Sequence, residues 1–131
     1  MAVQKPGVPE DVRRFILTSI PSVPYVEALL LMRKSPGQPW TVQRLARELY
    51  STERQAGELL QQLEESGVAS RSAAEPAELR YQPVTPELGA RLDALADSYS
   101  KNLMAVTDLI HSRIDRRAQR FADAFRWRKD E

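Results

Sequence analysis

Apolar residues recur at helical spacing through most of the chain, and prolines divide the periodic segments. The nine prolines form two groups, over residues 6–39 and 76–86, and none follows residue 86. Proline removes a backbone donor and breaks helix interiors, so helices run uninterrupted where proline is absent. The pattern therefore predicts a mainly α-helical chain whose longest helical block is C-terminal.

Three amphipathic helices are expected in the first half of the chain. Residues 10–20 carry one apolar face that includes Phe15 and Ile16. The next helix follows Ser22, a residue type that caps helix starts, and its broad apolar set is typical of a helix central to a core. Thr41 then precedes a helix with apolar residues at i, i+3, i+4 and i+7, the spacing of a single buried face.

A fourth helix and a hairpin follow. Thr52 and Gln55 fit the capping-box pattern, in which the two side chains bond each other's backbone amides. Gly67 stands where a left-handed residue would end this helix. The link between the third and fourth helices is so short that the two must meet at a sharp corner. Strand candidates at 68–71 and 79–82 then predict a β-hairpin with a polar tip.

The segment after Pro86 is the longest periodic block. Its apolar stripe runs past residue 120 with a mean spacing above the 3.5 residues of a left-handed coiled coil, which argues against one long heptad zipper. We expect a long helix, a break between His111 and Asp115, and a shorter terminal helix.

The stripe on this long helix needs a partner surface. A chain of 131 residues can cover it only by folding back, so a symmetric homodimer is the expected solution. Asn102 stands beside the stripe and either pairs across the two-fold axis or faces solvent. The residues expected at the dimer interface are Leu92, Leu95, Tyr99, Leu103, Val106 and Ile110.

The order of three helices, a hairpin and a long helix resembles the winged helix-turn-helix of MarR-like and PadR-like regulators. The resemblance rests on residues 40–50 as the lead helix, 52–67 as the recognition helix and 68–82 as the wing. The ending at 121–130 is similar to that of a small group of bacterial regulators with a C-terminal helical arm. One departure is Tyr50, near the corner where such motifs often carry glycine.

The resemblance implies a fold and a function together. The fold would be mainly α with a small β-hairpin wing, divided into an N-terminal extension (1–21), a winged domain (22–84) and a helical arm (85–131). The function would be sequence-specific DNA binding by a homodimeric regulator of bacterial transcription, with the start of the recognition helix on base edges. Base contacts are then expected from Arg54, Gln55, Glu58 and Gln61, and phosphate contacts from Arg44, Thr52, Arg71 and Arg80.

The charge distribution argues against DNA binding. The chain has 19 basic and 18 acidic residues, so no field of one sign is available to hold a polyanion. Residues 52–65 contain one arginine and four glutamates, whereas phosphate neutralisation supplies most nonspecific affinity for DNA. Gln55, suited to reading adenine, is also needed by the capping box. The alternative is a winged-helix adaptor that binds a protein through this acidic helix, its arginines paired with neighbouring glutamates.

The C-terminal end carries the clearest charge asymmetry. Residues 111–131 hold seven basic and four acidic residues. Interleaved with Phe121, Phe125 and Trp127, the basic tail over 113–129 suits a nucleic acid, an acidic protein or an anionic membrane surface. The alternative is that its aromatic side chains pack on the chain or on a second subunit while the arginines stay in water.

The sequence contains few residues arranged for catalysis. The chain has no cysteine and a single histidine, which excludes thiolate sites and relays of several imidazoles. His111 between Asp108 and Asp115 is typical of a solvated charge cluster, and the glycines are too scattered to form a phosphate-binding loop. We expect no enzyme, no metal and no cofactor. A ligand crevice is a further possibility, lined by Tyr25, Trp40 or Tyr99.

The sequence predicts a cytoplasmic location. The first ten residues contain no apolar run of secretory length. The longest apolar stretch, residues 28–32, is far shorter than the roughly 20 residues of a membrane span.

Overall fold

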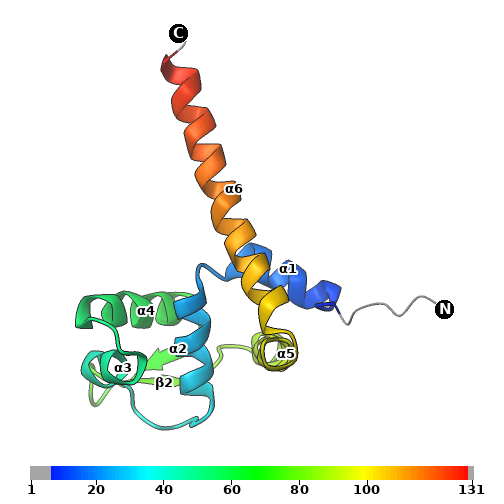
Figure 1. Cartoon of the computed structure of the whole chain (residues 1–131). Helices are drawn as coiled ribbons and strands as arrows, with labels where there is room; N and C mark the ends of the chain where they lie inside the picture. Colours follow the sequence, from blue (N-terminus) through cyan, green and yellow to red (C-terminus); the bar gives the residue numbers. More distant parts are fainter. Residues whose placement is uncertain (1–6, 130–131) are drawn as a thin grey trace, which may run out of the picture. The chain divides into compact units, whose positions relative to one another are not determined.

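The structure, a computed structural model, describes residues 7–129, the last five of them by their backbone alone. Within that range lie six helices and one two-stranded antiparallel sheet (Figure 1). The expected mainly helical fold with a small hairpin is confirmed. The elements are α1 (Glu10–Ser19), α2 (Val23–Arg33), α3 (Val42–Leu49), α4 (Glu53–Glu65), β1 (Ala69–Arg71), β2 (Leu79–Tyr81), α5 (Pro86–Lys101) and α6 (Leu103–Lys129).

The chain divides into two units whose boundary differs from the one expected between residues 84 and 85. The larger unit is Val23–Ala96, and the smaller one combines residues 1–22 with residues 97–131. The boundary thus falls inside α5, and α1 belongs with α6. Periodicity along the chain carries no information on this pairing, because only tertiary packing joins the two helices.

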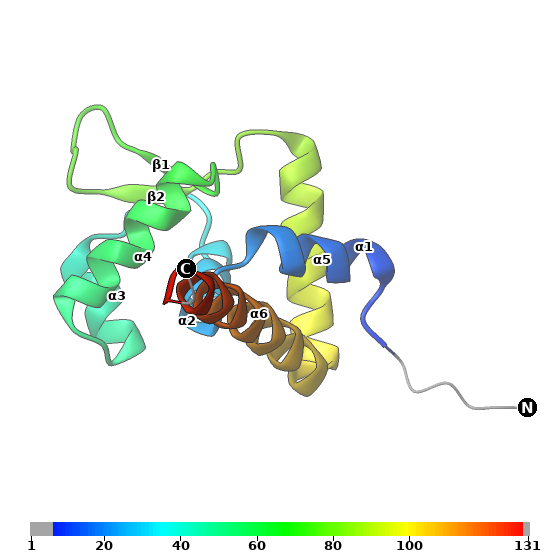
Figure 2. The ribbon, with the colours of Figure 1, turned by 90° about the horizontal axis from the view of Figure 1, so that it is seen from above.

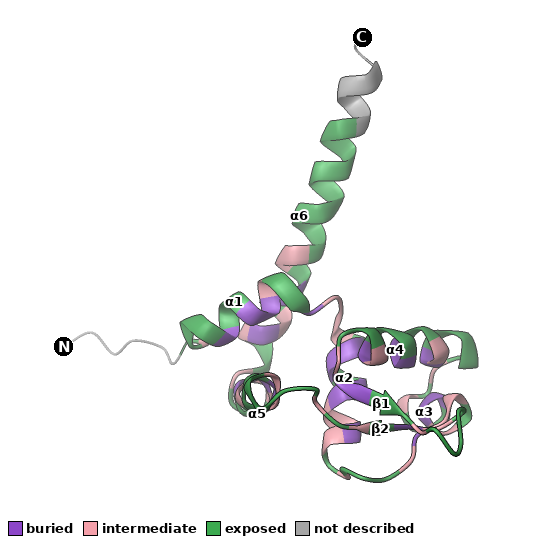
Figure 3. Cartoon of the chain, turned by 180° about the vertical axis from the view of Figure 1, so that it is seen from behind, coloured by how far each residue is buried: buried purple, intermediate pink, exposed green. Residues whose placement is uncertain are grey.

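Helix α2 is the centre of the larger unit. Val26, Leu29 and Met32 have no exposed surface, and α2 contacts α3, α4 and β2. Leu45 of α3 and Leu63 of α4 are also fully buried (Figure 3). Burying one such side chain stabilises a fold by about 1.5–3 kcal/mol, so these apolar faces hold the unit together.

Side-chain caps begin α3 and α4 as the sequence predicts. Thr41 Oγ1 accepts a hydrogen bond from the Arg44 amide at 3.2 Å. At the start of α4, Thr52 Oγ1 accepts from the Gln55 amide at 3.1 Å, and Gln55 Oε1 accepts from the Thr52 amide at 3.3 Å. The capping box is confirmed, and both caps satisfy amides that a helix start leaves unbonded.

Tyr50 forms the corner between α3 and α4. Its φ of 53° lies in the left-handed region that favours glycine. This conformation lets the Ser51 amide donate to the Ala46 carbonyl at 2.9 Å, which closes α3. The Tyr50 side chain is 97% exposed. A tyrosine therefore adopts the conformation for which such corners often carry glycine.

The hairpin is confirmed to within one residue of its expected strands. β1 pairs with β2 in antiparallel register, with Ser70 opposite Arg80. On the other edge of β2, Leu79 and Trp40 exchange two backbone hydrogen bonds of 2.9 and 2.7 Å. Leu79 is therefore paired on both sides. Gly67, with φ of +79°, turns the chain from α4 into β1.

In the smaller unit, α1 packs on the first part of α6 (Figure 2). Phe15 of α1 and Ile110 of α6 are among the buried residues. The Arg113 guanidinium donates a hydrogen bond to the Ile20 carbonyl. Beyond Arg113, every residue through Ala124 is exposed (Figure 3). Helix α1 thus covers only part of α6.

The break in the C-terminal helix lies at Asn102, so the expected break between His111 and Asp115 was wrong. Helix α6 runs through those residues without interruption. The Asn102 amide donates to the Ser98 carbonyl at 2.8 Å, and the Asn102 carbonyl accepts from the Val106 amide at 3.1 Å. One residue thus ends α5 and begins α6. An apolar spacing close to 3.6 rotates a stripe slowly around a continuous helix and requires no break.

Substituting Gly67 should destabilise the larger unit. The left-handed conformation costs a residue with a Cβ about 1–2 kcal/mol, and a Cβ at Gly67 would lie 2.7 Å from Val84 Cγ2. Gly67→Ala should therefore lower the free energy of unfolding by at least about 1 kcal/mol in a denaturant titration.

Gly57→Ala is the matched control, because Gly57 lies in the middle of α4. A Cβ there would meet Val42 Cγ2 at an ordinary 3.8 Å. Its expected effect is a gain of about 0.5–1 kcal/mol from helix propensity. Equal effects of the two substitutions would contradict the assignment of the turn to Gly67.

Candidate binding groove beside α4

A groove of about 490 Å³ opens in the larger unit between the start of α3, one side of α4 and the hairpin. Its apolar lining includes Val42, Leu60 and Leu79. Gly57 contributes no side chain, which keeps the space between α3 and α4 open. The polar lining consists of Gln43, Gln61, Glu64, Glu65 and Arg71. The groove thus offers apolar and acidic surface side by side.

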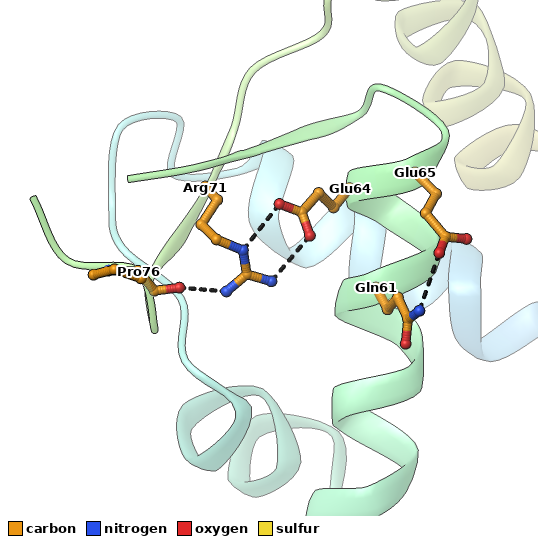
Figure 4. A network of polar contacts seen from close by, with 5 residues as sticks. All are labelled: Gln61, Glu64, Glu65, Arg71 and Pro76. Atoms are coloured by element: carbon orange, nitrogen blue, oxygen red, sulfur yellow. Dashed lines mark hydrogen bonds and ion pairs between the residues drawn. The ribbon is translucent and has the colours of Figure 1, made fainter. Parts of the chain in front are cut away.

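Arg71 and Glu64 form a two-bond ion pair across the groove (Figure 4). Arg71 Nε and Nη2 donate to the two Glu64 carboxylate oxygens, each at 2.9 Å. Arg71 Nη1 also donates to the Pro76 carbonyl in the hairpin loop. The hydrogen bond from Arg71 lowers the pKa of the Glu64 carboxyl, and the same bond raises the pKa of Arg71. Arg71 is therefore paired at the surface, with its side chain still 42% exposed.

The rest of the exposed side of α4 is acidic. Gln61 Nε2 donates to Glu65 Oε1 at 3.0 Å, which orients that carboxylate without neutralising it (Figure 4). Arg54 lies 3.6 Å from Glu58, but the two side chains are 90% and 65% exposed. An exposed pair at this separation is weak and screened by salt. We call the exposed carboxylates Glu53, Glu58 and Glu65 the acidic face of α4.

Most side chains expected to contact DNA are engaged within the chain. Thr52 and Gln55 cap each other, and Arg71 is paired with Glu64. Arg44 Nη1 donates to the Pro39 carbonyl at 2.8 Å, and the Arg44 guanidinium stacks 3.9 Å from the centroid of the Trp40 ring. Such stacking of a cation on an aromatic face is attractive and holds Arg44 in place.

Arg47, Arg54 and Arg80 are exposed side chains on α3, α4 and the hairpin of the larger unit. Arg54 and Arg80 were expected at DNA, and Arg47 lies on α3. Arg80 lies on the outward side of the hairpin opposite Ser70. Within residues 7–124, neither Arg47 nor Arg80 forms an ion pair. Across residues 23–96, eight basic residues face ten acidic ones, so the unit as a whole is not cationic.

The apolar stripe expected at a dimer interface is largely interior. Leu92, Leu95, Val106 and Ile110 have no exposed surface in the chain. Tyr99 is partly buried, and Leu103 is 48% exposed. The stripe therefore does not provide the uncovered surface from which the dimer was argued.

The residues expected to line a ligand crevice, and His111, were also located in the structure. Tyr25 and Trp40 are core residues with 3% and 2% exposure, and the Tyr25 hydroxyl lies 2.7 Å from Ser66 Oγ. His111 is exposed, and no group of three metal-binding side chains occurs in the described part of the chain. The expected contributions of Phe125, Trp127 and the basic side chains after residue 124 lie outside the described residues.

Two features of the candidate site could not be predicted from the sequence. The groove brings together Val42, Leu60 and Leu79 from three elements, which no local spacing could indicate. The pairing of Arg71 with Glu64 likewise depends on the hairpin folding back beside α4. The sequence shows that Tyr50 stands where glycine is common, but it does not show that the Tyr50 side chain is almost fully exposed.

Comparisons with known proteins add no further constraint. The chain matches no family model, no curated protein and no solved structure. Within residues 7–129, no single helix has the length and apolar character needed to cross a membrane.

The Arg71–Glu64 pair makes stability depend on pH. Because the pKa of Glu64 is lower in the folded state, the stabilisation is present above the unfolded pKa and is lost as pH falls through the folded pKa. Arg71→Met should raise the pKa of Glu64 and remove this dependence. The difference in unfolding free energy between wild type and Arg71→Met should then be largest near neutral pH and shrink in acid.

Denaturant titrations over a pH series, with NMR titration of the glutamate carboxyls, measure both effects. Arg91→Met, at an exposed position on α5, is the control and should leave the pKa of Glu64 unchanged. A pKa of Glu64 that is equal in wild type and Arg71→Met would show that the pair does not form in solution.

Proposed function

We propose that this chain is a winged-helix protein-interaction module whose groove binds a basic, amphipathic segment of a partner protein. The order of α2, α3, α4 and the hairpin supports a winged helix, as does the sharp corner at Tyr50. The backbone pairing of Trp40 with Leu79 adds a third strand-like segment to the hairpin, which also fits a wing.

The observation that carries this proposal is the neutralisation of Arg71 by Glu64. It engages the cation best placed beside α4 with a carboxylate of the same helix, so that a phosphate there would have to compete with Glu64. Glu58 and Glu65 remain exposed with their charges directed to solvent. A surface of this sign attracts cationic partners and repels polyanions.

The shape of the groove favours a helix with one large apolar side chain. Leu60 and Leu79 are each only 2% exposed, so an apolar anchor in the groove would contact Val42 and Ala77. A helix placed in a groove typically uses anchors one or two turns apart. Arginines of the partner would then lie beside Glu65 and Glu58. The apolar contact supplies the affinity, and the charges supply orientation and association rate.

A fluorescein-labelled helical peptide with arginines on one face and a phenylalanine on the other tests the proposal by anisotropy. The protein should bind it, and Glu65→Lys should weaken binding by about 3- to 10-fold, the effect of one lost attraction and one new repulsion between exposed charges. Glu27→Lys, at an exposed position on α2 that does not line the groove, is the matched control.

Replacing the peptide's arginines with glutamates should abolish binding. Binding that is equally strong with the acidic peptide, or that both lysine variants weaken alike, would contradict a specific role for the groove.

A second candidate function is sequence-specific binding of duplex DNA, as expected from the regulator-like order of elements. It is favoured by the 90% exposed Arg54 side chain in the first turn of α4, where winged helices contact base edges. Exposed Arg80 on the hairpin would then contact phosphate.

The two candidates predict opposite effects of the same substitution. Glu65→Lys should weaken peptide binding but strengthen DNA binding, because it removes a charge that repels phosphate. Retention of genomic DNA fragments across a salt series measures the second effect, and Arg54→Glu with Arg80→Glu should abolish it. Retention no tighter than that of a neutral control protein at low salt would exclude DNA binding.

A further inference from the structure

Within its own unit, α6 is covered by α1 only along its first half. Residues 114–124, which we call the arm, are all exposed, whereas Val106 and Ile110 in the preceding turns are buried (Figure 3). An isolated helix of this length is only marginally stable in water. The arm therefore gains most from a surface outside its own unit.

The arm has one apolar side. Ile114, Ala118 and Phe121 follow each other at intervals of four and three residues, which places them on one side of a helix. Ile114 is 41% exposed and Phe121 is 74% exposed. An exposed phenylalanine between arginines is the kind of anchor that helix-in-groove binding uses.

The charge of the arm selects its partner. The arm carries three arginines and two aspartates, and by sequence the longer stretch 113–129 carries seven basic and two acidic residues. Two such helices would repel each other if they paired side by side. Helix α4 has the opposite balance, with four glutamates and one arginine over residues 52–65. The same chain therefore carries a basic amphipathic helix and an acidic face beside an apolar groove.

The groove has a volume of about 490 Å³, and its accessible apolar lining is Val42 and Ala77, since Leu60 and Leu79 are each 2% exposed.

We infer that the partner segment is the arm of a second copy of this chain, with Phe121 in the groove and the flanking Arg117 and Arg120 beside the acidic face of α4. This inference rests on the proposed binding function of the groove. Each copy supplies one arm and one groove, so a two-fold pair contains the contact twice. The homodimer then forms through α6 and α4 rather than through the stripe on α5 and α6.

A charge exchange in the full chain tests the inference by sedimentation velocity over a concentration series. Wild type should dimerise, and the dimer should dissociate as salt rises to about 0.5 M, where exposed charges are screened. The double variant Arg117→Glu, Arg120→Glu should raise the dimer dissociation constant at least 10-fold. The double variant Glu58→Arg, Glu65→Arg should do the same. Combining both sets should restore dimerisation, because opposite charges again face each other.

The matched control reverses two exposed arginines elsewhere in the smaller unit, Arg13→Glu with Arg14→Glu, and should leave the dimer unchanged. Circular dichroism checks that each variant keeps its helix content. A chain that is monomeric at every concentration would overturn the inference. A dimer that persists when Glu58 and Glu65 are reversed would overturn it as well, because the arms would then have another site.

The failure of this inference is distinguishable from failure of the proposed function. If wild type is monomeric but binds the arginine- and phenylalanine-containing peptide in a Glu65-dependent manner, the groove binds basic segments and the second copy is not its partner. If it neither dimerises nor binds the peptide, both are wrong.

Discussion

The two hydrogen bonds between Arg71 and Glu64 join the hairpin to α4, and the shape and charge of the groove depend on that connection. The pair holds the end of β1 beside the last turns of α4, and Arg71 also fixes the hairpin loop through the Pro76 carbonyl. On the other edge of the hairpin, Leu79 is bound to Trp40 by two backbone hydrogen bonds. With both edges held, Val42, Leu60 and Leu79 stay close enough to line one cavity. The same pair consumes the positive charge that a nucleic-acid contact at this position would need.

Local signals were sufficient to predict most of the elements. The caps at Thr41 and Thr52, the turn at Gly67 and the hairpin strands all depend on residues near each other in the sequence, and the structure confirms them. The break at Asn102 could not be placed from the sequence, because the spacing of apolar residues does not show at which residue the helical backbone hydrogen bonds are interrupted. A helix that rotates its stripe and a helix that breaks produce similar spacing over a few turns.

The candidate site was harder to predict, because it depends on which charges meet after folding. Counting residues showed that α4 is acidic, but it left Arg71 and Arg44 available for phosphate. In the structure, one is paired with Glu64 and the other is held between Pro39 and Trp40. The interior position of Leu92 and Leu95 could not be read from their spacing either, since a covered stripe and an uncovered one have the same period.

The near-balance of charge in the whole chain combines unlike parts. Residues 23–96 carry an excess of two acidic residues, and the remainder carries an excess of three basic ones. A protein built in this way suits recognition between its own two kinds of surface, or between its acidic groove and a basic partner.

The most direct test of the groove as a binding site is to map amide chemical shifts of the ¹⁵N-labelled chain during titration with the arginine- and phenylalanine-containing peptide. The largest changes are expected at Gly57, Leu60, Glu65 and Leu79, which line the groove from α4 and the hairpin. Changes confined to the first turn of α4 around Arg54, or absent from α4 altogether, would contradict it.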